Sequence, residues 1–112
     1  QYVNVLTVEK ESQIYQFPFT EILWIEVIGD YTSIYTNTIQ LCVRKTLKSI
    51  ESELPINKFV RTSRNTIVNI KKIKKVETSF SGTMSATLSN NQKIHISRKY
   101  WKNIKKRILD ND

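Results

Sequence analysis

The alternation of apolar and polar positions predicts a chain built mainly of strands. Such alternation, or a short run of β-branched apolar residues, is typical of strands. Segments of this kind cover 2–8, 12–17, 22–28, 31–36 and 39–44 in the first half, and 71–80, 83–89 and 93–97 in the second. Turn-forming residues separate several of them, notably Gly29-Asp30 and Asn90-Asn91, and these predict hairpins.

Two other segments have the spacing of amphipathic helices. Residues 47–54 place apolar side chains at i, i+3 and i+7 behind Thr46, a favoured N-cap residue. Residues 98–109 repeat this spacing behind Ser97, with Trp101 among the residues expected in the core and Lys and Arg on the outer face. We therefore expect a mainly β fold of eight or nine strands, with two or three short helices, the last at the C-terminus.

Length and composition favour one globular domain over residues 1–112. A chain of 112 residues can bury a core, and 25% charged and 39% apolar residues are typical of a globular protein. No apolar run reaches the length of about 18 residues that a membrane span needs. The single cysteine, Cys42, cannot form an internal disulfide and fits a reducing, cytoplasmic setting. Because the chain begins at Gln, we expect a fragment of a longer protein.

Charge divides the chain into two unlike halves. Residues 1–57 carry four basic and seven acidic side chains, whereas residues 58–112 carry fourteen basic and three acidic ones. A net charge of +11 in one half points to a polyanion, first of all nucleic acid. The alternative is a lysine-rich surface that only keeps the protein soluble.

Groups for catalysis or metal binding are sparse. The one histidine, His95, lies in a predicted strand, and the carboxylates are scattered along the chain. No pair of Cys or His residues has zinc-ligand spacing, and no glycine-rich phosphate loop is present. We therefore expect neither an enzyme nor a bound metal or cofactor.

One polar run lies between apolar residues. The stretch FVRTSRNTIVN (59–69) begins with Phe59-Val60 and ends near Ile67-Val68, so both its ends are expected to be anchored in the core. Between them lie guanidinium, hydroxyl and amide groups, which suit phosphates and base edges. This favours a stiff recognition loop, with Asn69 turning the chain beyond it. An ordinary solvated loop with capping residues explains the same pattern.

Four segments resemble the LytTR-type DNA-binding domain of bacterial transcriptional regulators. FVRTSRNTIVNIKKI (59–73) is similar to the family pattern F-x-R-x-H-R-S, apolar-V-N, a polar pair and Ile. The other three occur in the family's order and together extend the resemblance over about residues 3–109: ILWIEVIGDYTSIYT (22–36), RKTLKSIESEL (44–54) and NNQKIHISRKYWKNIKK (90–106). The chain departs from the pattern at Ser63, Asn65 and Gln92, where the family usually has His, Ser and Gly.

The resemblance implies an elongated arrangement of small antiparallel sheets that binds double-stranded DNA without a recognition helix. Loops would enter successive major grooves and bend the duplex. Three places would face the DNA: the loop at Asp30, Tyr31 and Thr32; the polar run at Arg61, Ser63, Arg64 and Asn65; and the helix start at Ser97, Arg98 and Lys99. Arg98 is the strongest candidate for contacting bases, whereas Ser97 serves either DNA binding or only as a helix cap.

The family's partners follow from the same resemblance. Its members bind paired direct repeats in promoters, so two copies would act together on DNA, behind an upstream receiver domain or membrane segment. Two other classes of function stay open. One is an RNA-binding or general polyanion-binding module. The other is a protein-interaction domain that uses exposed aromatic residues, namely Tyr31, Tyr35, Phe80 and Tyr100.

Overall fold

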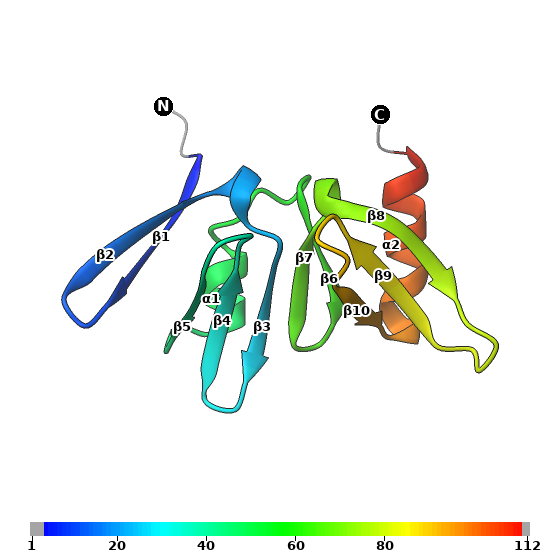
Figure 1. The fold of residues 1–112 in the computed structure, drawn as a ribbon, viewed down its shortest axis with the longest axis horizontal. Coiled ribbons are helices and arrows are strands. Elements are labelled where there is room, and N and C mark those ends of the chain that lie inside the picture. Colours follow the sequence, from blue (N-terminus) through cyan, green and yellow to red (C-terminus); the bar gives the residue numbers. More distant parts are fainter. Residues whose placement is uncertain (1–3, 111–112) are drawn as a thin grey trace.

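Three small antiparallel sheets lie side by side in the computed structural model, which describes residues 4–110 (Figure 1). Within these residues ten strands, two α-helices and two 3₁₀ turns follow one another. The molecule measures 47 × 34 × 24 Å along its principal axes. The expected mainly β, elongated fold with a C-terminal helix is therefore confirmed, although the strands outnumber the eight or nine expected. Between residues 4 and 110 no helix is both long and apolar enough to cross a membrane.

The first sheet is a two-stranded hairpin of β1 (Val5–Lys10) and β2 (Gln13–Pro18). Its two turn residues, Glu11 and Ser12, have φ of 51° and 67°, the left-handed conformation that two-residue hairpin turns require. Of the strand predicted over 2–8, residues 2 and 3 lie outside the described part, and β1 extends beyond the predicted end to Lys10. After β2 the chain makes a 3₁₀ turn, η1 (Phe19–Glu21).

The central sheet has five strands in the order β5-β4-β3-β7-β6. The predicted hairpin at Gly29-Asp30 joins β3 (Trp24–Ile28) to β4 (Tyr31–Tyr35), and β5 (Gln40–Val43) pairs with β4. The short helix α1 (Leu47–Glu51) follows, and the Thr46 hydroxyl caps it by accepting a hydrogen bond from the Ser49 N–H at 3.1 Å. The chain then returns to the sheet as β6 and β7.

The stretch 59–69 is a β-hairpin, which corrects the loop expected over 61–66 between its apolar anchors. Strands β6 (Phe59–Ser63) and β7 (Thr66–Asn69) pair with each other, and β7 also pairs with β3. Only Arg64 and Asn65 form the turn. The register shifts between Arg61 and Ser63, which places a bulge at Thr62.

The third sheet contains β8 (Ile73–Thr78), β9 (Met84–Leu88) and β10 (Lys93–Ile96), in the order β10-β9-β8. A 3₁₀ turn, η2 (Ile70–Lys72), leads from β7 into it. The predicted turn at Asn90-Asn91 joins β9 to β10, with Asn91 at φ 71°. The C-terminal helix α2 (Arg98–Asp110) packs beside this sheet and β6 (Figure 1).

The central sheet separates two hydrophobic cores. The first core fills the space between this sheet, the β1–β2 hairpin and α1, and the second lies between it, the third sheet and α2. Neighbouring residues of β3 alternate between them, with Trp24 in the second core and Ile25 in the first. A strand covered on both faces is apolar at consecutive positions, which explains the run at 22–28. Trp101 is only half-buried against the second core, whereas Ile104 is fully buried.

Asn69 joins segments that are distant in the sequence. Its side-chain oxygen accepts from the Lys71 N–H at 3.0 Å, which confirms the expected local turn. Its amide nitrogen also donates to the carbonyl oxygens of Phe19 and Ile22, at 3.2 and 2.9 Å. Since the residue is buried, these hydrogen bonds are needed to satisfy its amide. Asn69 therefore fixes η1 and η2 to each other.

Candidate nucleic-acid interface

The three expected contact segments lie along one edge of the molecule (Figure 1). We call this edge, formed by residues 29–31, 63–66 and 97–99, the turn edge. Figure 1 shows the β3–β4 turn, the β6–β7 turn and the start of α2 at the lower side, and the beginning of β1 and the end of α2 at the upper side. The segments come from different elements, so only the tertiary structure brings them together.

Backbone hydrogen bonds fix these segments to one another. The Val27 N–H donates to the Asn65 carbonyl oxygen at 2.9 Å, so the β6–β7 turn is held beside β3. The Ser97 N–H donates to the Thr62 carbonyl oxygen at 2.8 Å, so the start of α2 is held at the bulge of β6. The turn edge is therefore built on strand pairing rather than on free loops.

The first segment exposes two of its three expected residues. Asp30 is exposed and Tyr31 is 40% exposed, but Thr32 is only 3% exposed and pairs with Val43 inside the sheet. Arg44 stands across from Tyr31, donates to its hydroxyl at 3.1 Å and lies 5.0 Å from its ring centroid. Arg44 was not among the contact residues predicted from the sequence. Pairing the predicted strands 31–36 and 39–44 across Asn37-Thr38 would have found it.

In the second segment the two arginines have different surroundings. The Arg61 guanidinium contacts the Glu51 carboxylate at 3.0 and 3.3 Å and also donates to the Arg64 carbonyl oxygen. Its side chain is only 21% exposed. Arg64, by contrast, is exposed on the turn. Arg61 therefore holds the turn in place, whereas Arg64 extends from it.

Ser63 and Asn65 shape the same turn. The Ser63 hydroxyl accepts a hydrogen bond from the Asn65 N–H at 3.2 Å, a local bond typical of serine in turns. Ser63 is half-buried and Asn65 is exposed. The turn thus presents mainly the side chains of Arg64 and Asn65 to the solvent.

The third segment is the start of α2. Ser97 precedes the helix, and its carbonyl oxygen accepts from the N–H groups of Tyr100 and Trp101, at 3.0 and 3.2 Å. Arg98 and Lys99 are exposed, and the Lys99 amine lies 5.6 Å from the Tyr100 ring centroid. The helix N-terminus, which attracts anions, therefore opens onto the turn edge beside two cations.

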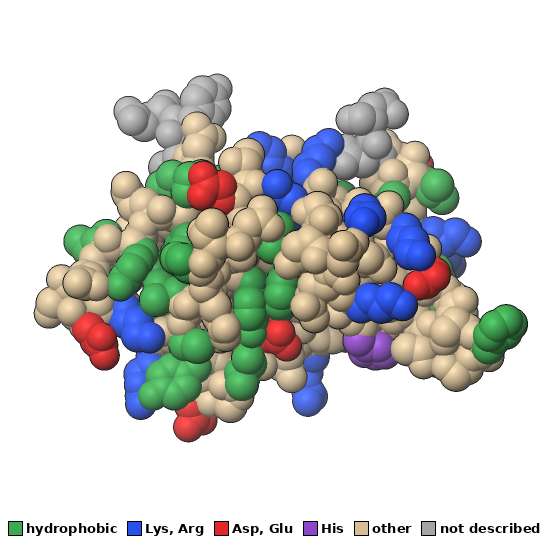
Figure 2. Space-filling view, in the orientation of Figure 1, with side chains coloured by type: hydrophobic (Ala, Val, Ile, Leu, Met, Phe, Trp, Pro, Cys, Tyr) green, Lys and Arg blue, Asp and Glu red, His purple; other side chains and the backbone are tan. Residues whose placement is uncertain are grey.

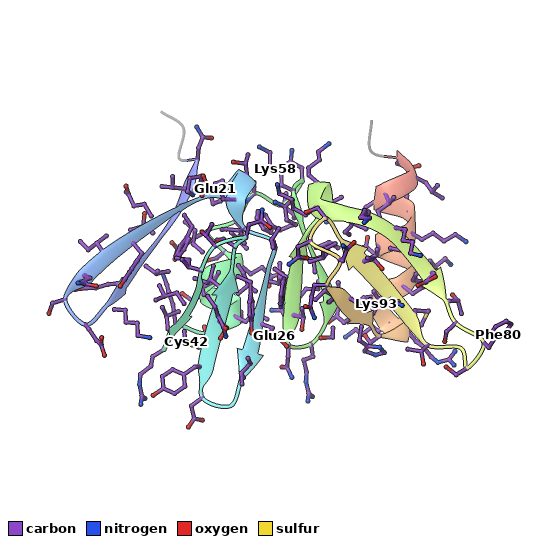
Figure 3. All side chains as sticks on the ribbon, in the orientation of Figure 1. Glu21, Glu26, Cys42, Lys58, Phe80 and Lys93 are labelled. Atoms are coloured by element: carbon purple, nitrogen blue, oxygen red, sulfur yellow. The ribbon has the colours of Figure 1, made fainter. Side chains whose placement is uncertain are left out.

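Basic side chains also lie away from the turn edge. Figure 2 shows many of them over the part of the molecule formed by the third sheet and α2, and Figure 3 shows Lys58 near the upper edge and Lys93 on the third sheet. Lys75 and Lys93 contact Glu77, at 3.7 and 3.5 Å. The cations of the turn edge and its neighbouring strand end are Arg44, Arg64, Arg98 and Lys99.

The four aromatic residues considered for protein interaction fall into two pairs. Tyr31 and Phe80 are exposed, whereas Tyr35 and Tyr100 pack against the second core. Tyr35 stacks on Trp24 with 3.9 Å between ring centroids. Burial raises the pKa of the Tyr35 hydroxyl, and the nearby Glu26 carboxylate raises it further. The exposed aromatic surface is therefore smaller than expected.

Among residues 4–110, no group of three or more His, Cys, Asp or Glu side chains forms a candidate metal site.

Comparison with known proteins identifies the family. The model of the LytTr DNA-binding domain matches residues 12–109. The sensory transduction protein LytR of Staphylococcus epidermidis is 32% identical over 105 residues, which are 94% of this chain and 42% of that protein. The sensory transduction protein LytT of Enterococcus faecalis is 30% identical over 105 residues, 94% of this chain and 43% of that protein. The chain thus spans less than half the length of these relatives.

A solved structure shows the same fold. A LytTr DNA-binding domain from Bacillus cereus superposes with a TM-score of 0.82 at 21% identity, over 96% of this chain and 98% of that one. The family model covers all four segments on which the resemblance was based, and it begins at residue 12 rather than at about residue 3. The chain therefore belongs to the LytTr DNA-binding domain family.

Proposed function

We propose that this chain binds double-stranded DNA in a sequence-specific manner and that the turn edge is the contacting surface. The observation that carries this proposal is the alignment of three separate segments along one edge, each with exposed polar or cationic side chains. Duplex DNA is a long polyanion, so a row of such segments can follow it. Membership of a family of DNA-binding domains supports the same function.

Two arginines are proposed to contact bases. Arg64 on the β6–β7 turn and Arg98 at the start of α2 are exposed, and their guanidinium groups can each bind guanine O6 and N7 together. Asn65, Lys99 and the N–H groups at the start of α2 are assigned to phosphates, as are Tyr31 and Arg44. Arg61 and Ser63 position the turn, and the buried Thr32 supports the sheet beneath it.

The length of the molecule supports contacts in more than one groove. The longest axis measures 47 Å. One turn of B-DNA spans about 34–36 Å. The turn edge occupies the middle part of this axis in Figure 1, and we assign its separate segments to successive major grooves of a bent duplex, as the family resemblance implies.

We further propose that the chain is the effector domain of a bacterial transcriptional regulator. Relatives carry names such as sensory transduction protein and, in Staphylococcus aureus, transcriptional regulatory protein LytR. In this proposal two copies bind direct repeats on DNA. Each copy follows an upstream receiver domain or membrane segment, and the DNA-binding domain lies in the cytoplasm. β1 begins at the edge opposite the turn edge, so an upstream domain attached there leaves the DNA-facing side open.

Selection of bound duplexes from a random DNA pool tests the function. The selected site is then compared with a scrambled duplex and with double-stranded RNA of the same sequence, at one fixed salt concentration. We expect the selected DNA to bind at least a hundredfold more tightly than either competitor. Equal binding to all three would replace sequence-specific DNA binding with general polyanion binding.

Two variants connect this activity to the turn edge. Arg64→Ala is expected to weaken binding to the selected site at least fivefold. The matched control Lys58→Ala removes a cation at the opposite edge and is expected to leave the affinity within twofold. Equal losses in both variants would remove the turn edge from the proposal.

A further inference from the structure

The hairpin between β8 and β9 carries an unusual residue at its tip. Phe80 is fully exposed, with a relative accessibility of 113%. Figure 3 shows it projecting from the end of the hairpin, at one end of the long axis and away from both cores. An aromatic ring in this position contributes nothing to the folded core, although burial of a phenylalanine is among the largest favourable contributions a side chain makes.

Backbone hydrogen bonds and a glycine hold the tip in a defined conformation. The Gly82 N–H donates to the Ser79 carbonyl oxygen at 3.0 Å, and the Ser79 N–H donates to the Thr83 carbonyl oxygen at 2.8 Å. Gly82 has φ of 86°, a conformation that closes tight hairpins and suits glycine. The Ser81 hydroxyl lies 2.9 Å from the Ser79 hydroxyl and 3.0 Å from the Thr83 hydroxyl. Phe80 is therefore presented on a defined turn.

The tip adjoins a segment already assigned to DNA. A guanidinium nitrogen of Arg98 lies 3.8 Å from the position that a Cβ atom on Gly82 would occupy. The surroundings of Phe80 thus combine one apolar apex with three hydroxyls and one cation. Hydroxyls and guanidinium groups bind phosphate oxygens, and an aromatic ring stacks on or inserts between bases. This combination of groups matches a nucleic acid better than it matches an apolar protein surface.

We propose that Phe80 is a further DNA-contact residue, an apolar wedge that the β8–β9 tip inserts into the minor groove next to the bases contacted by Arg98. This inference rests on the proposed DNA binding and extends it to the minor groove. The minor groove is about 6 Å wide. A single side chain at the apex of a two-stranded tip fits such a groove, and the hydroxyls beside it are placed for the flanking phosphates.

The wedge has a consequence for sequence preference. A ring that enters a base step partly unstacks it and kinks the duplex. Pyrimidine–purine steps unstack most easily, so they are preferred at the point of insertion although no hydrogen bond reads them. Phe80 would therefore add to the bend and favour a flexible step beside the selected site.

The test uses the whole 112-residue chain and its selected duplex. 2-Aminopurine is placed at successive steps flanking the site, and its fluorescence rises where a base unstacks. The distance between dyes at the two DNA ends reports bending. We expect wild-type protein to brighten the probe at one flanking step and shorten the end-to-end distance. Phe80→Ser should abolish the fluorescence signal, reduce the bend and weaken binding about tenfold.

Two further variants complete the experiment. Phe80→Tyr keeps a ring at the apex and is expected to retain the signal and the bend. Ile56→Ser removes another exposed apolar residue, 85% accessible and just before β6 at its end away from the turn edge, and is expected to behave as wild type. Circular dichroism checks that every variant is folded.

The outcomes separate the two proposals. Wild-type binding and bending that persist unchanged in Phe80→Ser would overturn the wedge and leave the proposed function standing. Absence of specific duplex binding by the wild-type chain would overturn the proposed function. A brightened probe that remains in Phe80→Ser would assign the unstacking to another residue.

Discussion

The backbone N–H of Ser97 donates to the carbonyl oxygen of Thr62 at 2.8 Å. This one hydrogen bond joins β6, at the edge of the central sheet, to the start of α2, and Thr62 lies at the bulge of β6. The hydrogen bond thereby sets the position of Arg98 relative to Arg64, the two residues proposed to contact bases.

Thr62 offers a test of stability. Its side chain is fully buried, and its hydroxyl has no hydrogen-bond partner among the described residues. Replacing a buried unsatisfied hydroxyl with a methyl group of similar size removes a desolvation cost, so Thr62→Val should raise the free energy of unfolding by about 1 kcal/mol. Urea unfolding measures this change. Thr87→Val is a matched variant, since the Thr87 hydroxyl is buried in the same manner. A lower stability in either variant would reveal a partner for its hydroxyl.

Replacing Glu51 is a test in which two explanations predict opposite changes in DNA affinity. Removing a carboxylate near DNA should strengthen binding if only net charge matters. Glu51, however, holds Arg61, which in turn holds the Arg64 carbonyl oxygen. We therefore expect Glu51→Gln to weaken binding to the selected site, by about 0.5–1 kcal/mol. Fluorescence anisotropy measures the affinity.

The same pair can be examined by a double-mutant cycle. Glu51→Gln combined with Arg61→Lys should show that the two losses in DNA affinity are not additive. Stability should change by less than about 1 kcal/mol, because the Glu51 side chain is 46% exposed and water screens the ion pair. Stronger DNA binding by Glu51→Gln would assign this carboxylate to simple repulsion.

A comparison of Arg98 and Lys102 variants distinguishes base contacts from general electrostatic attraction to the DNA. Arg98 begins α2 at the turn edge, and Lys102 lies about one helical turn further along the same helix. Arg98→Ala should weaken binding to the selected site by about 1–3 kcal/mol and reduce the preference at one base pair. Lys102→Ala should affect all sequences alike. Both variants are measured on the selected site and on its single-base variants, and uniform weakening by Arg98→Ala would make Arg98 a phosphate contact.

The dependence of affinity on salt counts the phosphate contacts. Four cations lie at the turn edge and the strand end next to it, namely Arg44, Arg64, Arg98 and Lys99. Arg44 and Lys99 are the two of them assigned to phosphates, and two neutralised phosphates give a slope of log K against log[salt] of about −2. A slope near −4 would make Arg64 and Arg98 phosphate contacts as well. A slope near −8 would show that lysines elsewhere on the third sheet also reach the DNA, and a slope near zero would exclude binding through phosphates.

Sequence patterns predicted much of the fold because each strand outside the centre has one buried face. The alternation in β1 and β10 and the spacing in α2 are direct results of that burial. The hairpin at 59–69 was missed for two physical reasons. Its strands are covered on both faces, so Phe59 and Val60 are both apolar, and its turn uses Arg64 and Asn65 without glycine. The bulge at Thr62 also interrupts the alternation.

The sequence indicated which segments form the candidate site, but not which of their side chains are exposed or what those side chains contact. Motif order indicated the three segments that the structure aligns along the turn edge. It did not indicate that Thr32 is buried or that Glu51 engages Arg61, since both depend on contacts between elements distant in the sequence. The exposure of Phe80 likewise depends on the hairpin that carries it beyond both cores.

The central sheet contributes one face to each of the two cores, and this arrangement determines how the molecule unfolds. Trp24 and Ile25 are adjacent on β3 yet belong to different cores, as do Ile67 and Val68 on β7. Loss of structure on either side would expose one apolar face of the central sheet to water, so we expect the two halves to lose their structure together. The amide hydrogens of β3 and β7 should therefore exchange with solvent only through global unfolding. The arrangement that lines up the turn edge thus also makes the whole chain a single cooperative unit.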